Sequence, residues 1–461
     1  MASTTYEQVP ITDRYPGLRN LMMEFHQMKD FLADPLVVTD GEGVRVRDQD
    51  GRWYYDGVSG IAAIQLGHGN QPIIDAMKAQ MDRIALALPV HAVNEPEIQL
   101  AEMLAGITPP EFTKVKFASG GSEANETAIK LVRQFHKQTG NPGKYKVISR
   151  YKSFHGATLG TLAATGGAAR KSKFEPLPTG FVHVHPPECY QCPFKLTYPD
   201  CGVACARILE DVILGEGPET VAAFIAEPVV MSAEAFYVPP MEYLQIIREI
   251  CDRFNVTLIF DEIVTGFGRL GEMFAADAFG VYPDIITVGK GLSSGYAPLS
   301  AVIMRDEIAG SFWGDTAENV HFNSGHTYSG SPVACAAGVS AVRQIRDDEV
   351  LGNARQQGKH LQARLLDMGE RYDVIGQVEG RGLLWGVEFV TDRNTHARFP
   401  VDRPFGRAVG RAARKGGLIA RAGNDAFVFA PPLVVTKTEI DDMADILDAA
   451  IAETLEGYSQ G

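Results

Sequence analysis

The sequence around Lys290 is more typical of a reactive lysine in a confined site than of a lysine exposed to solvent. Residues 284–292 read DIITVGKGL, so Lys290 follows an apolar strand pattern and lies between Gly289 and Gly291. Two glycines remove side-chain bulk, which lets a flat aldehyde reach the amine, and a confined site lowers the pKa of a lysine toward nucleophilicity. The alternative is a structural lysine whose stem packs at the strand end while its amine stays in water.

A carboxylate ends the most hydrophobic strand pattern of the chain. Residues 256–260 read VTLIF, and Asp261 follows them. A buried, ionised carboxylate needs a partner because desolvating it unpaired is costly, and a protonated pyridine nitrogen would be such a partner. A cofactor that accepts an electron pair from its substrate needs that ring proton. The alternative is an aspartate that caps the next turn.

A glycine-rich turn separates a strand pattern from a helix pattern at residues 118–131, which read ASGGSEANETAIKL. The first N–H groups of a helix have no partner within it, so the turn at Gly121 and the hydroxyl of Ser122 can cradle a phosphate. The alternative is an ordinary capped helix start. One face of the predicted helix is apolar, at Ala124, Ala128, Leu131 and Phe135.

Other candidate residues also follow strand patterns. Phe154 and His155 come after one such pattern, and Glu227 ends another. Phe154 could stack on a planar ring, although an aromatic residue after a strand is more often part of the core. Ligand sites in parallel sheets gather at the carboxyl ends of the strands, so we expect these residues to share a site with Lys290 and Asp261.

The elements that position these residues alternate between strand and helix patterns from about residue 115 to residue 305, which predicts parallel βαβ units. Their strand patterns lack a period of two, as is typical of strands covered on both faces. The strand patterns are at 146–149, 221–225, 256–260, 285–288 and 299–304.

Shorter strand patterns near both ends, at 37–56, 383–390 and 426–430, predict a smaller lobe to which both ends contribute. A chain of 461 residues exceeds the size at which one core usually stops growing, so two lobes are expected. The predicted units are an N-terminal segment of the small domain at 1–70, a large cofactor-binding domain at 71–345 and a C-terminal small domain at 346–461.

Composition argues against several classes of protein. The formal net charge of −14 repels nucleic-acid phosphates, and no basic run compensates for it. No segment offers the roughly 18 uninterrupted apolar residues of a membrane span, and the N-terminus lacks the pattern of a secretory signal. We therefore expect a cytoplasmic protein without a nucleic-acid or membrane partner.

Four of the six cysteines are close together in the sequence, at Cys189, Cys192, Cys201 and Cys205. Four thiolates at this spacing could bind zinc in a closed structural site. The chemistry outlined above does not need a metal, and we expect reduced cysteines in an insert instead. Six cysteines in a chain this long do not indicate a disulfide scaffold, which favours a reducing compartment.

Taken together, these segments resemble the class III aminotransferases, pyridoxal-phosphate enzymes of the aspartate-aminotransferase fold that include the amine:pyruvate ω-transaminases. The resemblance covers nearly the whole chain, and its most specific pieces are 121–125, 261–269 and Lys290. It implies PLP fold type I, an α/β fold with two domains. The large domain would hold a mostly parallel seven-stranded sheet between helices, and both chain ends would form a smaller α+β domain.

The resemblance also implies roles for the site residues. Lys290 would hold pyridoxal 5'-phosphate as a Schiff base and later move a proton between the substrate carbon and the cofactor. Asp261 would pair with the pyridine nitrogen, and Phe154 would stack on the ring. Gly121 with Ser122 would bind the phosphate.

Other positions bear on the subunit arrangement and on the substrate. A threonine like Thr327 reaches the phosphate of the neighbouring subunit's cofactor in this family, which implies a homodimer or a dimer of dimers. Val264 stands where GABA- and ornithine-type members usually carry glutamine beside the cofactor, whereas amine:pyruvate ω-transaminases commonly have an aliphatic residue. Arg421 matches the mobile arginine that clamps an α-carboxylate, and Trp53 is a further candidate for the substrate pocket. Glu234, in a segment that lacks the family's double glycine, has no assigned role.

The resemblance therefore implies transamination by two ping-pong half-reactions, from an amine or ω-amino acid to a keto acid such as pyruvate. Alternatives within the family are a GABA-, taurine- or diamine-type aminotransferase, a decarboxylase and an aminomutase, which share the lysine and the aspartate. From another class, the alternative is a binding protein that keeps the fold without turnover.

Overall fold

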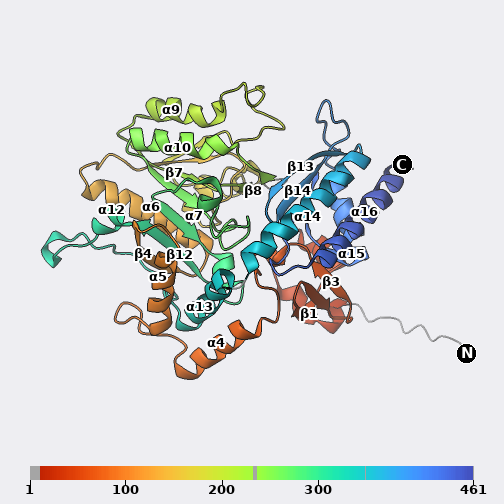
Figure 1. Cartoon of the computed structure of the whole chain (residues 1–461), viewed down its shortest axis with the longest axis horizontal. Helices are drawn as coiled ribbons and strands as arrows, with labels where there is room; N and C mark the ends of the chain where they lie inside the picture. Colours follow the sequence, from red (N-terminus) through yellow and green to blue (C-terminus); the bar gives the residue numbers. More distant parts are fainter. Residues whose placement is uncertain (1–10, 232–235, 348, 460–461) are drawn as a thin grey trace, which may run out of the picture.

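A seven-stranded sheet forms the centre of the larger lobe (Figure 1). It belongs to a computed structural model that describes residues 11–231, 236–347 and 349–459. The expected strands are present, with ends that differ by one or two residues. Their order across the sheet is β4 (Phe112–Ala118), β12 (Ser300–Arg305), β11 (Ile285–Val288), β10 (Thr257–Asp261), β7 (Val221–Ala226), β5 (Lys146–Arg150) and β6 (Phe181–Val184).

One strand of this sheet runs against the predicted direction. β12 is antiparallel to both β11 and β4, whereas the other neighbouring pairs are parallel. The expectation of parallel βαβ units was therefore wrong for the strand predicted at 299–304. The physical reason is the short connection at 289–299, since a parallel return needs a crossover of about a dozen residues or more.

Helices cover both faces of the sheet, so its central strands are apolar on both sides. α6 (Gly121–Gln138) and α12 (Asp306–Gly310) pack on one face, where Ile259 of β10 joins their core cluster. Leu258 and Phe260 belong to the cluster on the opposite face, as the period of two in a strand requires. Asp261 continues the alternation and is directed toward the α6 face. The opposite layer includes α9 (Ala204–Glu216) and α10 (Met241–Arg253).

Further helices flank the sheet beside β4 and below it in Figure 1. α13 packs against α4, α5 and the short turn η2 that begins at Lys290. Among the described residues, no helix combines the length and apolar character needed to cross a bilayer. The bounds are α4 (Gln71–Arg83), α5 (Glu95–Gly106), η2 (Lys290–Ser293) and α13 (Pro332–Asp347).

The smaller lobe brings the two chain ends together, as Figure 1 shows by the red strands beside the blue elements. β3 of the N-terminal part pairs in parallel with β15 of the C-terminal part, at Tyr55 and Leu418. The domain boundaries at 70/71 and 345/346 stay predictions. One small sheet has the order β1 (Val38–Glu42), β2 (Arg45–Asp48), β3 (Trp53–Asp56) and β15 (Leu418–Ile419). The other small sheet has the order β13 (Ile375–Arg381), β14 (Leu384–Phe389), β17 (Ala426–Phe429) and β16 (Arg421–Ala422). The long helices beside them are α14 (Val350–Arg371), α15 (Phe405–Gly416) and α16 (Lys437–Ser459).

Arg269 ties the two lobes together. Its fully buried guanidinium donates to Ser59 Oγ at 3.1 Å and to Gln65 Oε1 in the N-terminal part. It also donates to the backbone carbonyls of Leu383, at 3.2 Å, and Pro431, at 2.5 Å, in the C-terminal part. Burial lowers the pKa of Arg269 to about 9, which reflects the cost of desolvating its charge.

We predict that Arg269→Met destabilises the protein, because four acceptors from both chain ends lose one buried donor. A loss of about 3 kcal/mol is expected from the breaking of such a buried polar network. Urea unfolding followed by circular dichroism would detect it as a lower midpoint. Arg411→Met removes an exposed arginine of α15 and should change stability by less than about 0.5 kcal/mol. Equal midpoints for the two variants would contradict this role of Arg269.

Candidate functional site

Most of the predicted site residues surround one cavity of about 160 Å³ at the carboxyl ends of β5, β7, β10 and β11. The cavity is therefore at the edge of the sheet where parallel strands direct the residues that follow them. Of the residues singled out in the sequence, it is lined by Gly121, Ser122, Phe154, His155, Glu227, Asp261, Val264 and Lys290.

Asp261 is buried at the end of β10 and is held by two side chains. Its Oδ2 accepts from Asn125 Nδ2 at 2.7 Å and lies 2.8 Å from His155 Nδ1. Its Oδ1 accepts the backbone N–H of Ile263, at 3.2 Å, and no other donor of the described residues. No lysine or arginine of the described residues forms an ion pair with Asp261, so this carboxylate keeps accepting capacity for a cationic N–H in the cavity.

Asn125 is a site residue to which the sequence analysis assigned no role. Its amide nitrogen also donates to His155 O at 2.7 Å, and its Oδ1 accepts from Thr287 Oγ1 at 2.7 Å. The amide group is thus fixed in one orientation by neighbours on three elements. The sequence could have indicated a role for Asn125, because this polar residue adjoins Ala124 on the apolar face of α6. A buried polar side chain in such a position needs hydrogen-bond partners.

The start of α6 offers backbone donors without a side-chain cap. Gly120 precedes the helix and makes no side-chain capping bond, so the first N–H groups of α6 remain available at the cavity wall. Ser122 is beside them, and its Oγ accepts from the backbone N–H of Ala157 at 3.1 Å. The facing Gly156 has a φ of 145°, and a Cβ there would lie 2.7 Å from Ser122 Oγ. A glycine at position 156 therefore keeps this side of the cavity open.

Lys290 begins the turn η2 with a strained backbone. Its φ of 41° lies in the left-handed region, which costs a non-glycine residue about 1–3 kcal/mol. Its neighbour Gly291 contacts Gln65 so closely that a Cβ would lie 2.8 Å from that side chain. The amine makes no hydrogen bond with any described residue. Burial lowers its pKa to about 8, although the negative charges of Asp261 and Glu227 oppose that shift.

Glu227 and Phe154 also line the cavity. The carboxylate of Glu227 is buried and accepts the backbone N–H groups of Phe154 at 2.8 Å and Met231 at 3.1 Å. Burial raises the pKa of Glu227, and the negative charge of nearby Asp261 adds to this effect. Arg150 Nη2 donates to the backbone carbonyl of Glu227, which fixes the end of β7.

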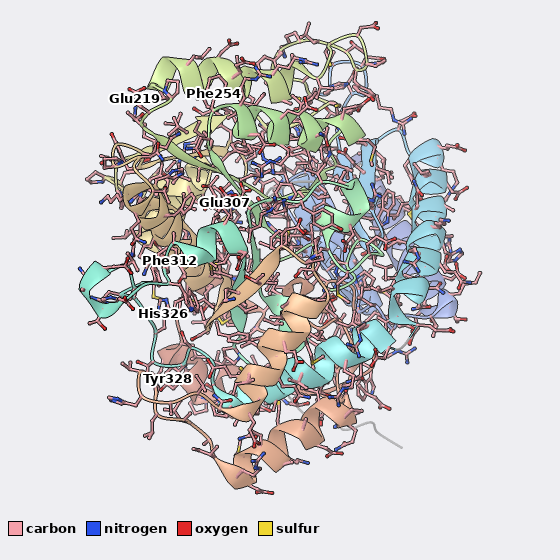
Figure 2. The ribbon with its side chains drawn as sticks, turned by 60° about the vertical axis from the view of Figure 1, so that its left-hand side comes forward. Glu219, Phe254, Glu307, Phe312, His326 and Tyr328 are labelled. Carbon is pink, nitrogen blue, oxygen red and sulfur yellow. The ribbon has the colours of Figure 1, made fainter. Side chains whose placement is uncertain are left out.

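Other predicted residues lie at or beyond the edge of the cavity. Arg421 is on β16 and is mostly buried, and its positive charge acts on both Lys290 and Glu227. Thr327 is exposed, and its neighbours His326 and Tyr328 lie near the left edge of Figure 2, on the segment between α12 and α13.

Trp53 stays a candidate for the substrate pocket and is not among the residues that line the cavity. Its side chain is 40% exposed, and the guanidinium of Arg47 lies 5.5 Å from its ring. Strand alternation accounts for this exposure, because the inward position on β3 belongs to Tyr54. Glu234 lies outside the described residues.

The four clustered cysteines line a separate cavity of about 20 Å³, away from Lys290. All four are free thiols, and burial raises the pKa of Cys205 to about 12. Within the ranges that the structure describes, no group of three or more His, Cys, Asp or Glu residues is arranged to hold a metal ion.

The lowered pKa of Lys290 predicts that its amine reacts at lower pH than an ordinary lysine. The protonated form does not react, so acylation of the ligand-free protein by acetic anhydride should rise with pH and level off above a midpoint near 8. The acylation of a lysine in a short peptide should show its midpoint at a pH of about 10.4. Mass spectrometry of the Lys290 peptide measures the rate.

Asp261→Asn provides the check on the cause of this shift. The charge of Asp261 raises the pKa of Lys290, so its removal should move the acylation midpoint to lower pH. A wild-type midpoint near that of the lysine peptide would contradict the environment described for Lys290.

Comparison with known proteins agrees with this geometry. Residues 28–451 match the family model "Aminotransferase class-III". An adenosylmethionine-8-amino-7-oxononanoate aminotransferase of Geobacter sulfurreducens is 35% identical over 435 residues, which cover 94% of this chain and 96% of the relative.

Solved structures give the same result. An (S)-enantioselective ω-transaminase from Thermomicrobium roseum is 35% identical, with a TM-score of 0.92 over 98% of this chain and 100% of that chain. The ω-transaminase of Pseudomonas jessenii in complex with PMP is 32% identical, with a TM-score of 0.91 over 97% and 99% of the two chains. The expected fold and cofactor class are thereby confirmed. The chain belongs to the class III aminotransferases, which are pyridoxal-phosphate-dependent transferases of PLP fold type I.

Proposed function

We propose that the chain is an ω-transaminase that moves an amino group from an amine or ω-amino acid to pyruvate in two ping-pong half-reactions. The observation that carries this proposal is the meeting of Lys290, Asp261 and the uncapped start of α6 around one cavity, with Arg421 beside it. The family alone does not fix the substrate, since its members carry names as different as an 8-amino-7-oxononanoate aminotransferase and an ω-transaminase.

The residues of the cavity fit pyridoxal 5'-phosphate. Bound there, the cofactor supplies an aldehyde that combines with amines and a ring that accepts an electron pair. We propose that Asp261 holds a proton on the ring nitrogen, because its free accepting capacity is directed into the cavity and Asn125 with His155 fixes its position. We further propose that the N–H groups at Gly121 and Ser122 hold the phosphate.

Two apolar side chains and one carboxylate complete the proposed cofactor site. Phe154 offers an aromatic face for stacking, and the backbone bond from its N–H to Glu227 fixes the loop that carries it. Val264 is buried at the cavity wall and offers no hydrogen bond to the cofactor's ring hydroxyl. An aliphatic residue there supports an amine:pyruvate type of ω-transaminase over a GABA or ornithine type.

Lys290 is the proposed acid–base residue. An amine with a pKa of about 8 is neutral in about one molecule in ten at pH 7, against fewer than about one in a thousand for an ordinary lysine, so it can attack a carbonyl carbon and later accept a proton. Arg421 is the proposed partner of the keto acid's carboxylate. A guanidinium suits that task because its N–H groups match a carboxylate in a bidentate arrangement.

We also propose a homodimer, or a dimer of dimers, in which Thr327 of one subunit reaches the cofactor phosphate of the other. The exposed position of Thr327 supports this, and so does the apolar surface between α4 and α5, where Leu88 and Val93 are each 67% exposed. Exposed apolar residues that are close together in one segment are typical of protein–protein contact sites. A cytoplasmic location is proposed because all six cysteines are free thiols.

The visible spectrum of the protein loaded with pyridoxal phosphate tests the proposed function. A band above 400 nm is the ordinary sign of a lysine-bound cofactor, and we expect it to bleach with a suitable amine and to return when pyruvate is added. Lys290→Ala should lack the band. Lys173→Ala, which removes an exposed lysine, should keep it.

Two results would count against the proposal in different ways. A wild-type protein that shows no such band after addition of pyridoxal phosphate would contradict the role of Lys290. A band that bleaches with amines and returns with 2-oxoglutarate, but not with pyruvate, would contradict the proposed acceptor.

A further inference from the structure

A second arginine lies beside the proposed ring-stacking residue. Arg170, on the short helix α8 (Ala168–Lys171), has its guanidinium carbon 4.8 Å from the ring centroid of Phe154. The ring centroid of Phe25 lies 5.0 Å from the same carbon. Phe154 lines the cavity, so Arg170 packs on a residue of the cavity wall. A guanidinium over an aromatic face keeps the N–H donors at its edge free for an anion.

The guanidinium of Arg170 has no anionic partner among the described residues. It forms no hydrogen bond or ion pair with any of them, and neither does the guanidinium of Arg421. The nearest carboxylate that acts on both is Glu227, which already accepts two backbone N–H groups. Partly buried cations that lack a paired carboxylate are costly in a fold, and an incoming anion would offset that cost.

The charge of Arg170 acts on Arg421. The positive charge of Arg170 lowers the pKa of Arg421, in addition to the larger effect of burial. Burial also lowers the pKa of Arg170, and the negative charge of Glu227 opposes that shift. A substrate anion beside the two guanidinium groups would favour their charged forms.

We propose that Arg170 is a specificity-determining residue that, together with Arg421, selects amine donors with an anionic group at the end remote from the amine. This inference rests on the proposed function and narrows its substrate class to ω-amino acids, with a carboxylate or a sulfonate as the anion. Arg421 alone is expected to bind the carboxylate of the keto acid. Arg170, whose guanidinium packs on an aromatic ring, provides a second hydrogen-bond donor for the anionic group of the amine substrate.

The test compares donors that differ only in their charged end, in single half-reactions of the loaded enzyme without keto acid. β-Alanine is set against propylamine, and taurine distinguishes sulfonate from carboxylate. Stopped-flow bleaching of the visible band gives the rate for each donor. For the wild type we expect faster bleaching by the anionic donors.

Substitution of Arg170 should remove this preference. Because a charge-assisted hydrogen bond contributes enough for about a 10- to 100-fold effect, Arg170→Gln should lower the rate ratio of anionic to neutral donor by that factor. Arg170→Lys should retain part of the ratio. Lys173→Gln removes one positive charge from an exposed position three residues along and should leave the ratio unchanged.

A binding measurement gives a readout that does not depend on turnover. Propanoate carries the anion of β-alanine but no amine, so it can occupy the site without reacting. Isothermal titration calorimetry of the loaded enzyme should show weaker propanoate binding in Arg170→Gln than in the wild type and in Lys173→Gln.

The outcomes separate this inference from the proposed function. If the wild-type band bleaches with none of the amines, the proposed function fails. If it bleaches with neutral amines and not with anionic ones, or if Arg170→Gln slows both classes equally, the role of Arg170 is overturned and the transaminase proposal stands. Loss of cofactor from Arg170→Gln with an unchanged donor ratio would likewise overturn it and assign Arg170 to cofactor binding.

Discussion

The site depends on one buried carboxylate that has no lysine or arginine partner among the described residues. Asp261 ends the apolar strand β10 and is buried, and Asn125 and His155 fix its Oδ2. A buried charge is unfavourable unless it is hydrogen-bonded and paired, so a neighbouring cation would stabilise the arrangement. The protonated ring nitrogen of the cofactor is the partner that this geometry supports. The same charge keeps the pKa of Lys290 from falling further.

The alternation of residues along the strands places Asp261 beside the side chains that hold it. Ile259 and Asp261 are on the α6 side of β10, and Thr287 is on the same side of β11, so Asn125 can reach both polar groups. The start of the same helix provides the backbone donors at the cavity wall. One helix and two strands therefore set the distance between the proposed phosphate site and the proposed ring-nitrogen site. Arg269 links the small lobe to these elements, because it donates hydrogen bonds to acceptors from both chain ends.

The sequence predicted the ranges of five large-lobe strands and most of the residues around the cavity because both follow local rules, whereas β6 was not predicted. Apolar runs mark the buried strands, and Lys290, Asp261 and Glu227 each follow one directly. The direction of β12 was not predictable from its composition, since parallel and antiparallel buried strands look alike and only the short connection at 289–299 separates them. The exposure of Trp53 was not predictable either, because a short strand with three aromatic residues in succession does not reveal which one faces inward. Asn125 and Arg170 required the structure, since their partners are distant in the sequence.

The protonation state of the bound cofactor tests the central claim about Asp261 most directly. The ¹⁵N chemical shift of pyridoxal phosphate labelled at its ring nitrogen can be measured on the loaded protein at neutral pH. The account predicts a protonated nitrogen in the wild type and an unprotonated one in Asp261→Ala. An unprotonated nitrogen in the wild type, or a protonated one that persists in Asp261→Ala, would contradict it.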